Sequence, residues 1–208
     1  MPIYKKFSET YERNFIMKKN LGAKTLIAPL PVFIIGTYDE SGVPNAMNAA
    51  WGTQCDYDKV FILLGEHKTT DNLKKTKAFT LSYATPETVD ISDYFGIESG
   101  RKIDKIKHAG VSVRKADFVN APVIEAYPFT LECELVEMQE VDGDFRIVGK
   151  IVNAIAEDSI LDEKGNVDLG KLRPIAYDSS AKVYRVLGEK VGNAFKDGLK
   201  IKRKSSNS

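Results

Sequence analysis

Residues 129–151 read FTLECELVEMQEVDGDFRIVGKI, and this stretch decides the fold. Apolar and polar side chains alternate from Phe129 to Leu135 and again from Phe145 to Ile151, which is the period of half-buried strands. Asp142-Gly143 lies between the two runs, and Asp-Gly is the strongest short hairpin signal. The stretch therefore predicts a long antiparallel hairpin.

Further strands are predicted on both sides of this hairpin. β-branched, aromatic or small residues bounded by turn residues indicate strands over 31–38, 45–53, 60–64, 78–83 and 181–186. The strand at 60–64 is apolar throughout, which predicts burial on both faces. Helices are expected at 5–18, where Phe7, Tyr11 and Phe15 are four apart, at 69–77, and as short insertions within 85–108. A mainly β fold with α insertions follows, built as an antiparallel barrel.

Composition excludes several classes of protein. The chain has 208 residues, which is enough for a core without disulfides or metal, and a formal net charge of +1, which argues against a dedicated nucleic-acid binder. Two cysteines and two histidines make a metal site of these residues improbable, and none is expected. The longest uncharged apolar stretch, 25–38, is too short to span a membrane and no secretory signal is recognised, so a cytoplasmic location is expected.

Familiar catalytic motifs are missing from the sequence. It contains no G-x-G-x-x-G after a strand, no P-loop, no G-x-S-x-G elbow and no H-E-x-x-H. Cys55 and His67 could form a thiolate pair, but two isolated residues are almost no evidence for a catalytic site. Cys133 is interpreted as a buried, inert cysteine. No catalytic residue is therefore nominated.

Residues 45–52 read NAMNAAWG and are candidates for holding a flat ring. Small residues in a strand let another group approach the backbone closely, and Trp51 offers an aromatic wall. The alternative is a small-residue strand that simply allows tight packing.

Residues 65–73 read GEHKTTDNL and are candidates for holding an anion. They follow a predicted buried strand and begin a predicted helix, and the N-terminus of a helix attracts negative charge. Lys68 and His67 would add positive charge at the same place. The alternative is an ordinary capped helix with a solvated lysine. A ring segment and an anion segment together would suit a mononucleotide.

Further segments along the chain match a known pattern, namely 29–32, 35–37, 42–47, Trp51, 67–73, 79–82, 99–105, 121–125, 131–133 and Tyr184. In the order and spacing of these segments, the chain resembles the flavin reductase-like family, close to the flavoredoxins. The resemblance implies a Greek-key split β-barrel with short flanking helices, and FMN bound at a homodimer interface. His67 stands where the family frequently has arginine, so more of the phosphate charge would rest on Lys68.

The resemblance also implies a set of cofactor-binding residues. Isoalloxazine and ribityl contacts would come from Asn45, Met47, Asn48, Ala49, Ala50 and Trp51. Phosphate contacts would come from His67, Lys68, Thr69 and Thr70, with Ser82 and Tyr83 beside them. The inserted helical segment would bring Ser99, Arg101 and Lys105 to the flavin or the pyridine nucleotide.

The function implied is an NAD(P)H-dependent flavin oxidoreductase, which passes a hydride from NADH or NADPH to FMN. A flavoredoxin-type electron carrier that serves partner proteins is the alternative, and a nucleic-acid-binding barrel with a basic tail is a remote third. The chain is expected to form one domain over 1–197, followed by a basic disordered tail at 198–208.

Overall fold

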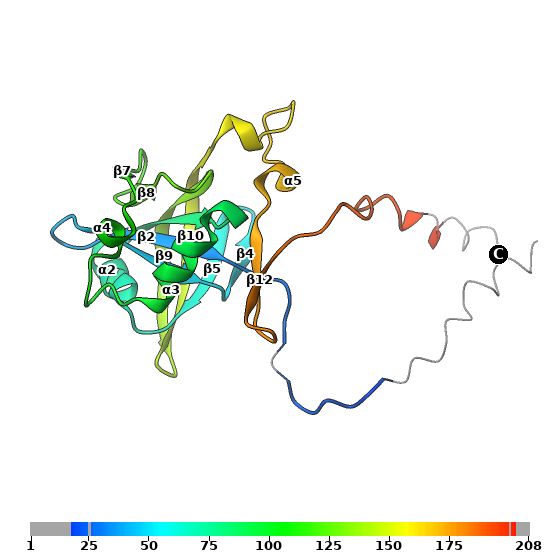
Figure 1. Cartoon of the computed structure of the whole chain (residues 1–208), viewed down its shortest axis with the longest axis horizontal. Coiled ribbons are helices and arrows are strands. Elements are labelled where there is room, and N and C mark those ends of the chain that lie inside the picture. The colour runs from blue at the N-terminus through cyan, green and yellow to red at the C-terminus, as the bar shows by residue number, and fades with distance from the viewer. Residues whose placement is uncertain (1–17, 25, 200, 203–208) are drawn as a thin grey trace, which may run out of the picture.

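The computed structural model describes residues 18–24, 26–199 and 201–202, so the helix predicted at 5–18 lies almost wholly outside the described residues. Figure 1 shows short helices set around strands. The strands are β1 (Leu30–Pro31), β2 (Phe33–Tyr38), β3 (Pro44–Ala49), β4 (Gly52–Asp56), β5 (Lys59–Leu64), β6 (Ala78–Tyr83), β7 (Val113–Lys115), β8 (Pro122–Ile124), β9 (Phe129–Val141), β10 (Asp144–Ala156), β11 (Ile175–Asp178) and β12 (Val183–Val186). The helices are α2 (Lys68–Thr76), α3 (Val89–Ile97), α4 (Lys105–Ala109) and α5 (Leu169–Leu172), with 3-10 turns η1 (Pro86–Thr88) and η2 (Asp158–Ile160).

The main sheet is antiparallel and has the strand order β3-β2-β6-β9-β10-β5-β4. The long hairpin predicted from the sequence is confirmed as β9 and β10, which pair from Phe129 with Ala156 to Val141 with Asp144. At Gly149 a Cβ atom would overlap the ring of Phe79, so only glycine lets β10 pass this core side chain. The mainly β prediction is confirmed.

The predicted strand over 45–53 is wrong in one respect, because it is two strands. β3 pairs with β2, whereas β4 pairs with β5 at the other end of the sheet order. The chain crosses between the two edges at Ala50 and Trp51, and the carbonyl of Trp51 accepts a hydrogen bond of 2.8 Å from the amide of Leu63. A break at this point is what brings the two edges of the sheet together into a barrel.

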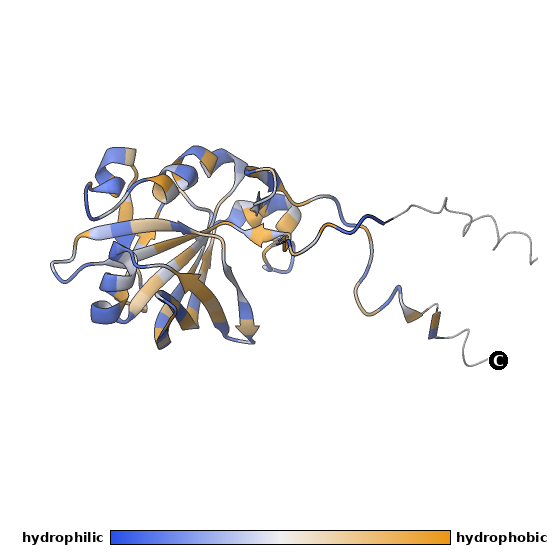
Figure 2. Cartoon of the chain, turned by 90° about the horizontal axis from the view of Figure 1, so that it is seen from below, coloured by the Kyte–Doolittle hydropathy of each residue, from blue (hydrophilic) through white to orange (hydrophobic). Residues whose placement is uncertain are grey.

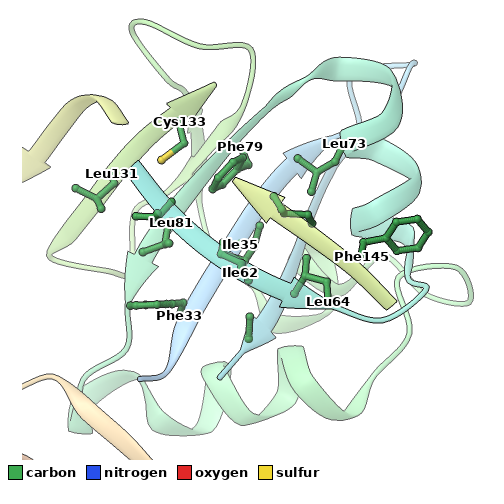
Figure 3. Packing of buried hydrophobic residues seen from close by; sticks show 13 residues of the cluster. Phe33, Ile35, Ile62, Leu64, Leu73, Phe79, Leu81, Leu131, Cys133 and Phe145 are labelled. Atoms are coloured by element: carbon green, nitrogen blue, oxygen red, sulfur yellow. The ribbon is translucent and has the colours of Figure 1, made fainter. Parts of the chain in front are cut away.

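The barrel interior is filled by side chains from every strand of the main sheet except β4, joined by Leu73 of α2. Figure 3 shows Ile35, Ile62, Phe79 and Leu81 pointing into this core, and Figure 2 shows the apolar residues concentrated on the strands. Burial along β5 alternates instead of being complete on both faces. The expectation of burial on both faces is therefore wrong, because one face of β5 packs into the barrel while the other is only partly covered.

Helices and two small sheets, β1-β11-β12 and β7-β8, lie around the barrel. α3 packs on β3, α2 packs on β2, and the sheet β1-β11-β12 lies beyond the barrel edge. The chain after β12 runs away from the barrel (Figure 1). Among the described residues there is no helix with the length and apolar character needed to cross a membrane.

Candidate ligand-binding cleft

An elongated cleft lies where β3, α2 and α3 meet. It consists of an outer compartment of about 480 Å³ and an inner compartment of about 220 Å³. Both compartments are lined by Met47, Asn48, His67, Gly96 and Ile97, so they adjoin along β3 and α3. The cleft is therefore continuous from the barrel edge to the N-terminus of α2.

The outer compartment has small and aromatic walls. The small walls are Ala49 and Ala50, and Trp51, a residue that is 57% exposed, lies beside them. The opposite wall comes from the β11–β12 hairpin, which contributes Tyr177 and Tyr184. Aromatic faces and flat backbone suit a planar ring system.

A hydrogen bond fixes the far wall of the outer compartment. The hydroxyl of Tyr184 donates to Asp93 Oδ1 of α3 at 2.7 Å. Burial, followed by the neighbouring Asp93 carboxylate, raises the pKa of Tyr184 to about 12. Tyr184 therefore remains a neutral donor at physiological pH, and it ties the hairpin to α3.

The inner compartment is built on the first turn of α2. The backbone amides of Lys68 and Thr69 belong to this turn, where N–H groups have no acceptor within the helix. The Thr69 hydroxyl accepts a hydrogen bond of 2.9 Å from the side-chain amide of Asn45. The hydroxyl of Thr70 bonds back to the backbone of His67, to its carbonyl at 2.7 Å and from its amide at 2.9 Å. These bonds order the loop that enters the helix.

Two lysines supply positive charge to the inner compartment. Lys68 pairs with Asp39 at 3.3 Å. Lys105 is only 4% exposed, and its ammonium donates to the carbonyls of Phe95 at 2.8 Å and Glu98 at 3.1 Å. An ammonium carries three donors, so two carbonyls leave one donor for a ligand.

The charge state of these groups follows from their surroundings. Burial lowers the pKa of Lys105 to about 8, so the side chain is mostly charged at pH 7. Burial first, and then the charges of Lys105 and Arg101, lower the pKa of His67, which is therefore neutral at pH 7. A phosphate group would meet Lys68, Lys105 and helix amides, with His67 as a neutral neighbour.

The structure brings most of the sequence-predicted site residues together. Eleven of them line the cleft: Asn45, Met47, Asn48, Ala49, Ala50, Trp51, His67, Lys68, Thr69, Ser99 and Lys105.

Four predicted site residues lie away from the cleft lining. Thr70 is buried in its bonds to His67, and the hydroxyl of Ser82 bonds that of Thr130 at 2.8 Å. Tyr83 packs against aromatic core residues and lines a different, apolar groove. Arg101 forms ion pairs with Asp71 of α2 and with Glu66, which precedes α2.

Several lining residues were missed by the sequence analysis. Asp93, Gly96 and Ile97 share one face of α3 at helical spacing, a signal that was present in the sequence. Tyr177 and Lys182 reach the cleft through pairing of β11 with β12 beside β1, and no local pattern reports that placement.

The fold and cleft define an antiparallel split barrel with one aromatic and one cationic compartment. A family model described as the flavin reductase-like domain matches residues 27–180. The chain belongs to the flavin reductase-like family.

Two solved structures agree with this family, and a curated relative is also similar to the chain. Flavoredoxin of Desulfovibrio vulgaris (Miyazaki F) is 32% identical, with 88% of this chain and 100% of that chain covered and a TM-score of 0.83. Flavoredoxin from Methanosarcina acetivorans is 26% identical, with 89% and 99% covered and a TM-score of 0.81. An uncharacterized protein of Aquifex aeolicus (strain VF5) is 24% identical over 172 residues, covering 79% of this chain and 88% of the relative.

Proposed function

We propose that the protein binds FMN in this cleft and acts as an electron carrier of the flavoredoxin type. The observation that carries the proposal is the pairing of a compartment with aromatic and small walls with an adjoining compartment that holds two lysines and a helix N-terminus. The similarity to two flavoredoxins over nearly their whole length supports the carrier role.

The residues in the cleft fit the parts of FMN. The ring would lie along Ala49, Ala50 and Trp51, where small side chains leave the backbone accessible. The phosphate would lie at the amides of Lys68 and Thr69 and near the ammonium of Lys105. When bound, the flavin supplies reversible electron transfer, and the protein supplies binding, orientation and electrostatics.

An NAD(P)H-dependent flavin oxidoreductase is the second candidate. The family match supports it, since the matched domain takes its name from flavin reductases. In that role FMN would exchange freely and NADH or NADPH would have to lie against the ring in the outer compartment. The carrier role instead requires slow release of FMN and electron exchange with a protein partner.

One experiment separates the two candidates. The FMN-saturated protein is passed through gel filtration, and NADH and NADPH oxidation is then followed with free FMN as acceptor. The carrier proposal expects FMN to remain bound and pyridine nucleotide oxidation to stay at the level of free FMN. Rapid turnover with loss of FMN on the column would favour the reductase.

We further propose that the protein is a homodimer with the cleft at the subunit interface. The exposure of Trp51 at the mouth of the cleft supports this, as does the exposed edge strand β4 that follows it. A second subunit would cover the indole and pair or shield that edge. Light scattering after gel filtration tests the proposal, and a monomer mass would contradict it.

A further inference from the structure

The segment 98–104, which connects α3 to α4, closes one side of the inner compartment. Glu98, Ser99 and Gly100 line that compartment. A Cβ atom at Gly100 would overlap Asn45 Oδ1 and lie 3.4 Å from Lys68 Cδ. The segment therefore lies directly against the residues that form the anion-binding end of the cleft.

Arg101 belongs to this segment but does not line the compartment, and its side chain reaches Asp71 in the first turn of α2 and Glu66 just before the helix. Its Nε and Nη2 atoms lie 3.1 and 2.8 Å from Asp71 Oδ2, and Nη2 lies 3.1 Å from Glu66 Oε1. The side chain is 44% exposed. Exposed ion pairs are individually weak and are screened by salt, so these contacts can open.

Hydrogen bonds to the buried Lys105 and within the segment itself also hold the segment in place. Lys105 donates to the carbonyl of Glu98, where the segment begins, and the amides of Lys102 and Ile103 donate to the carbonyl of Ser99 at 2.9 and 3.2 Å. The segment is thus a compact turn with a buried anchor at its base and Arg101 as its attachment to α2.

We propose that Arg101 is a positioning residue that holds segment 98–104 against α2, and thereby keeps the inner compartment closed around a bound phosphate without contacting it. The proposal rests on the proposed function for the identity of the ligand. The guanidinium also neutralises two carboxylates, Glu66 and Asp71, that flank an anion-binding helix terminus. An arginine that contacts the phosphate directly is the rival account.

The two accounts predict opposite changes in the rate of FMN dissociation for one double variant. Glu66→Gln with Asp71→Asn removes the attachment while also removing two negative charges near the phosphate. Direct contact by Arg101 predicts slower FMN dissociation from this variant. The guanidinium would be free to bind the phosphate, and the two carboxylates would no longer repel it. The positioning role predicts faster dissociation, by about 2- to 10-fold for the loss of two exposed ion pairs.

The experiment combines FMN dissociation rates with hydrogen exchange at the amides of Lys102 and Ile103. Arg101→Ala and the double carboxamide variant should both raise exchange and dissociation, and combining them should add nothing further. A matched control is Arg173→Ala with Glu87→Gln, an ion pair of 3.1 Å and similar exposure distant in sequence from the segment.

Exchange is measured first without FMN, so the result stands even if the ligand assignment fails. Unchanged exchange at Lys102 and Ile103 in Arg101→Ala would overturn the proposal. Faster FMN dissociation in Arg101→Ala that persists undiminished when the carboxylates are already neutralised would also overturn it, because Arg101 would then act on the ligand directly.

Discussion

The side-chain amide of Asn45 donates a hydrogen bond of 2.9 Å to the hydroxyl of Thr69. This bond joins β3, which lines both compartments of the cleft, to the first turn of α2, which forms the cationic end. Both residues are buried, so the bond holds the first turn of α2 against β3 at the inner end of the proposed FMN site.

Asn45→Ala should therefore weaken both the fold and the site. Removing a buried donor and leaving its partner unsatisfied costs about 1–3 kcal/mol of unfolding free energy. Urea unfolding without FMN measures that loss, and FMN titration should show weaker binding. Asn166→Ala, in an exposed turn, is the control and should leave FMN affinity unchanged. Wild-type FMN affinity in Asn45→Ala would contradict the role of this bond.

Lys68→Met should weaken FMN binding more than riboflavin binding. A charge-assisted hydrogen bond contributes about 1.5–3 kcal/mol, so the FMN dissociation constant should rise at least about tenfold. Fluorescence titration with both flavins measures the difference. Lys75→Met is the matched control, since Lys75 lies in the last turn of the same helix and pairs with Glu40 at 3.5 Å. Equal losses for FMN and riboflavin would remove Lys68 from the phosphate site.

Binding of FMN should weaken as the pH rises through about 8, the pKa of Lys105 in the free protein. Above that pH the neutral amine no longer attracts the phosphate. The ordinary lysine pKa of 10.5 applies to the unfolded chain, so between pH 8 and 10.5 the unfolded state binds more protons. Lys105 therefore increases the free energy of unfolding of the FMN-free protein as the pH rises from about 8 to 10.5.

Lys105→Met should remove the contribution of Lys105 to the pH dependence of FMN binding and of stability. FMN affinity would be lower than in the wild type at pH 7 and nearly level up to pH 9, and the rise in stability above pH 8 would be smaller. Titrations and urea unfolding at four pH values measure the two curves. A wild-type affinity that stays constant from pH 7 to 9.5 would contradict the role assigned to the ammonium.

Gly100→Ala should open the inner compartment, because the new methyl group overlaps Asn45 Oδ1 and the segment must move outward. We expect weaker FMN binding with little change in riboflavin binding. Gly188→Ala, where an added Cβ meets nothing within 4 Å, is the control. Unaltered FMN affinity in Gly100→Ala would show that this close approach is not part of the phosphate site.

Local sequence patterns predicted the strands and helices well where one face is buried. The alternation from Phe129 to Ile151 specified β9 and β10, and the helix predicted at 69–77 matches α2 within one residue at each end. The break at Ala50 and Trp51 was missed, because it depends on which partner strand each half finds and not on the residues themselves.

The lining of the cleft was predictable where it is continuous in the chain. Asn45, residues 47–51 and residues 67–69 line the cleft from two short segments of the chain, and their chemistry was visible in the sequence. Ser82 and Tyr83, which the resemblance implied beside the phosphate contacts, lie outside the cleft lining, since β6 is a central strand whose side chains meet Thr130 and Phe129 of β9. Tyr177 and Lys182 depend on long-range pairing of a separate sheet, which periodicity does not report.

The most direct test of the central claim is the visible spectrum of the purified protein after FMN is added and free ligand is removed by gel filtration. FMN binding in the cleft predicts flavin absorption bands that co-elute with the protein at one FMN per chain, and loss of that signal in Lys68→Met. A colourless protein that neither retains FMN nor changes its fluorescence would contradict the claim.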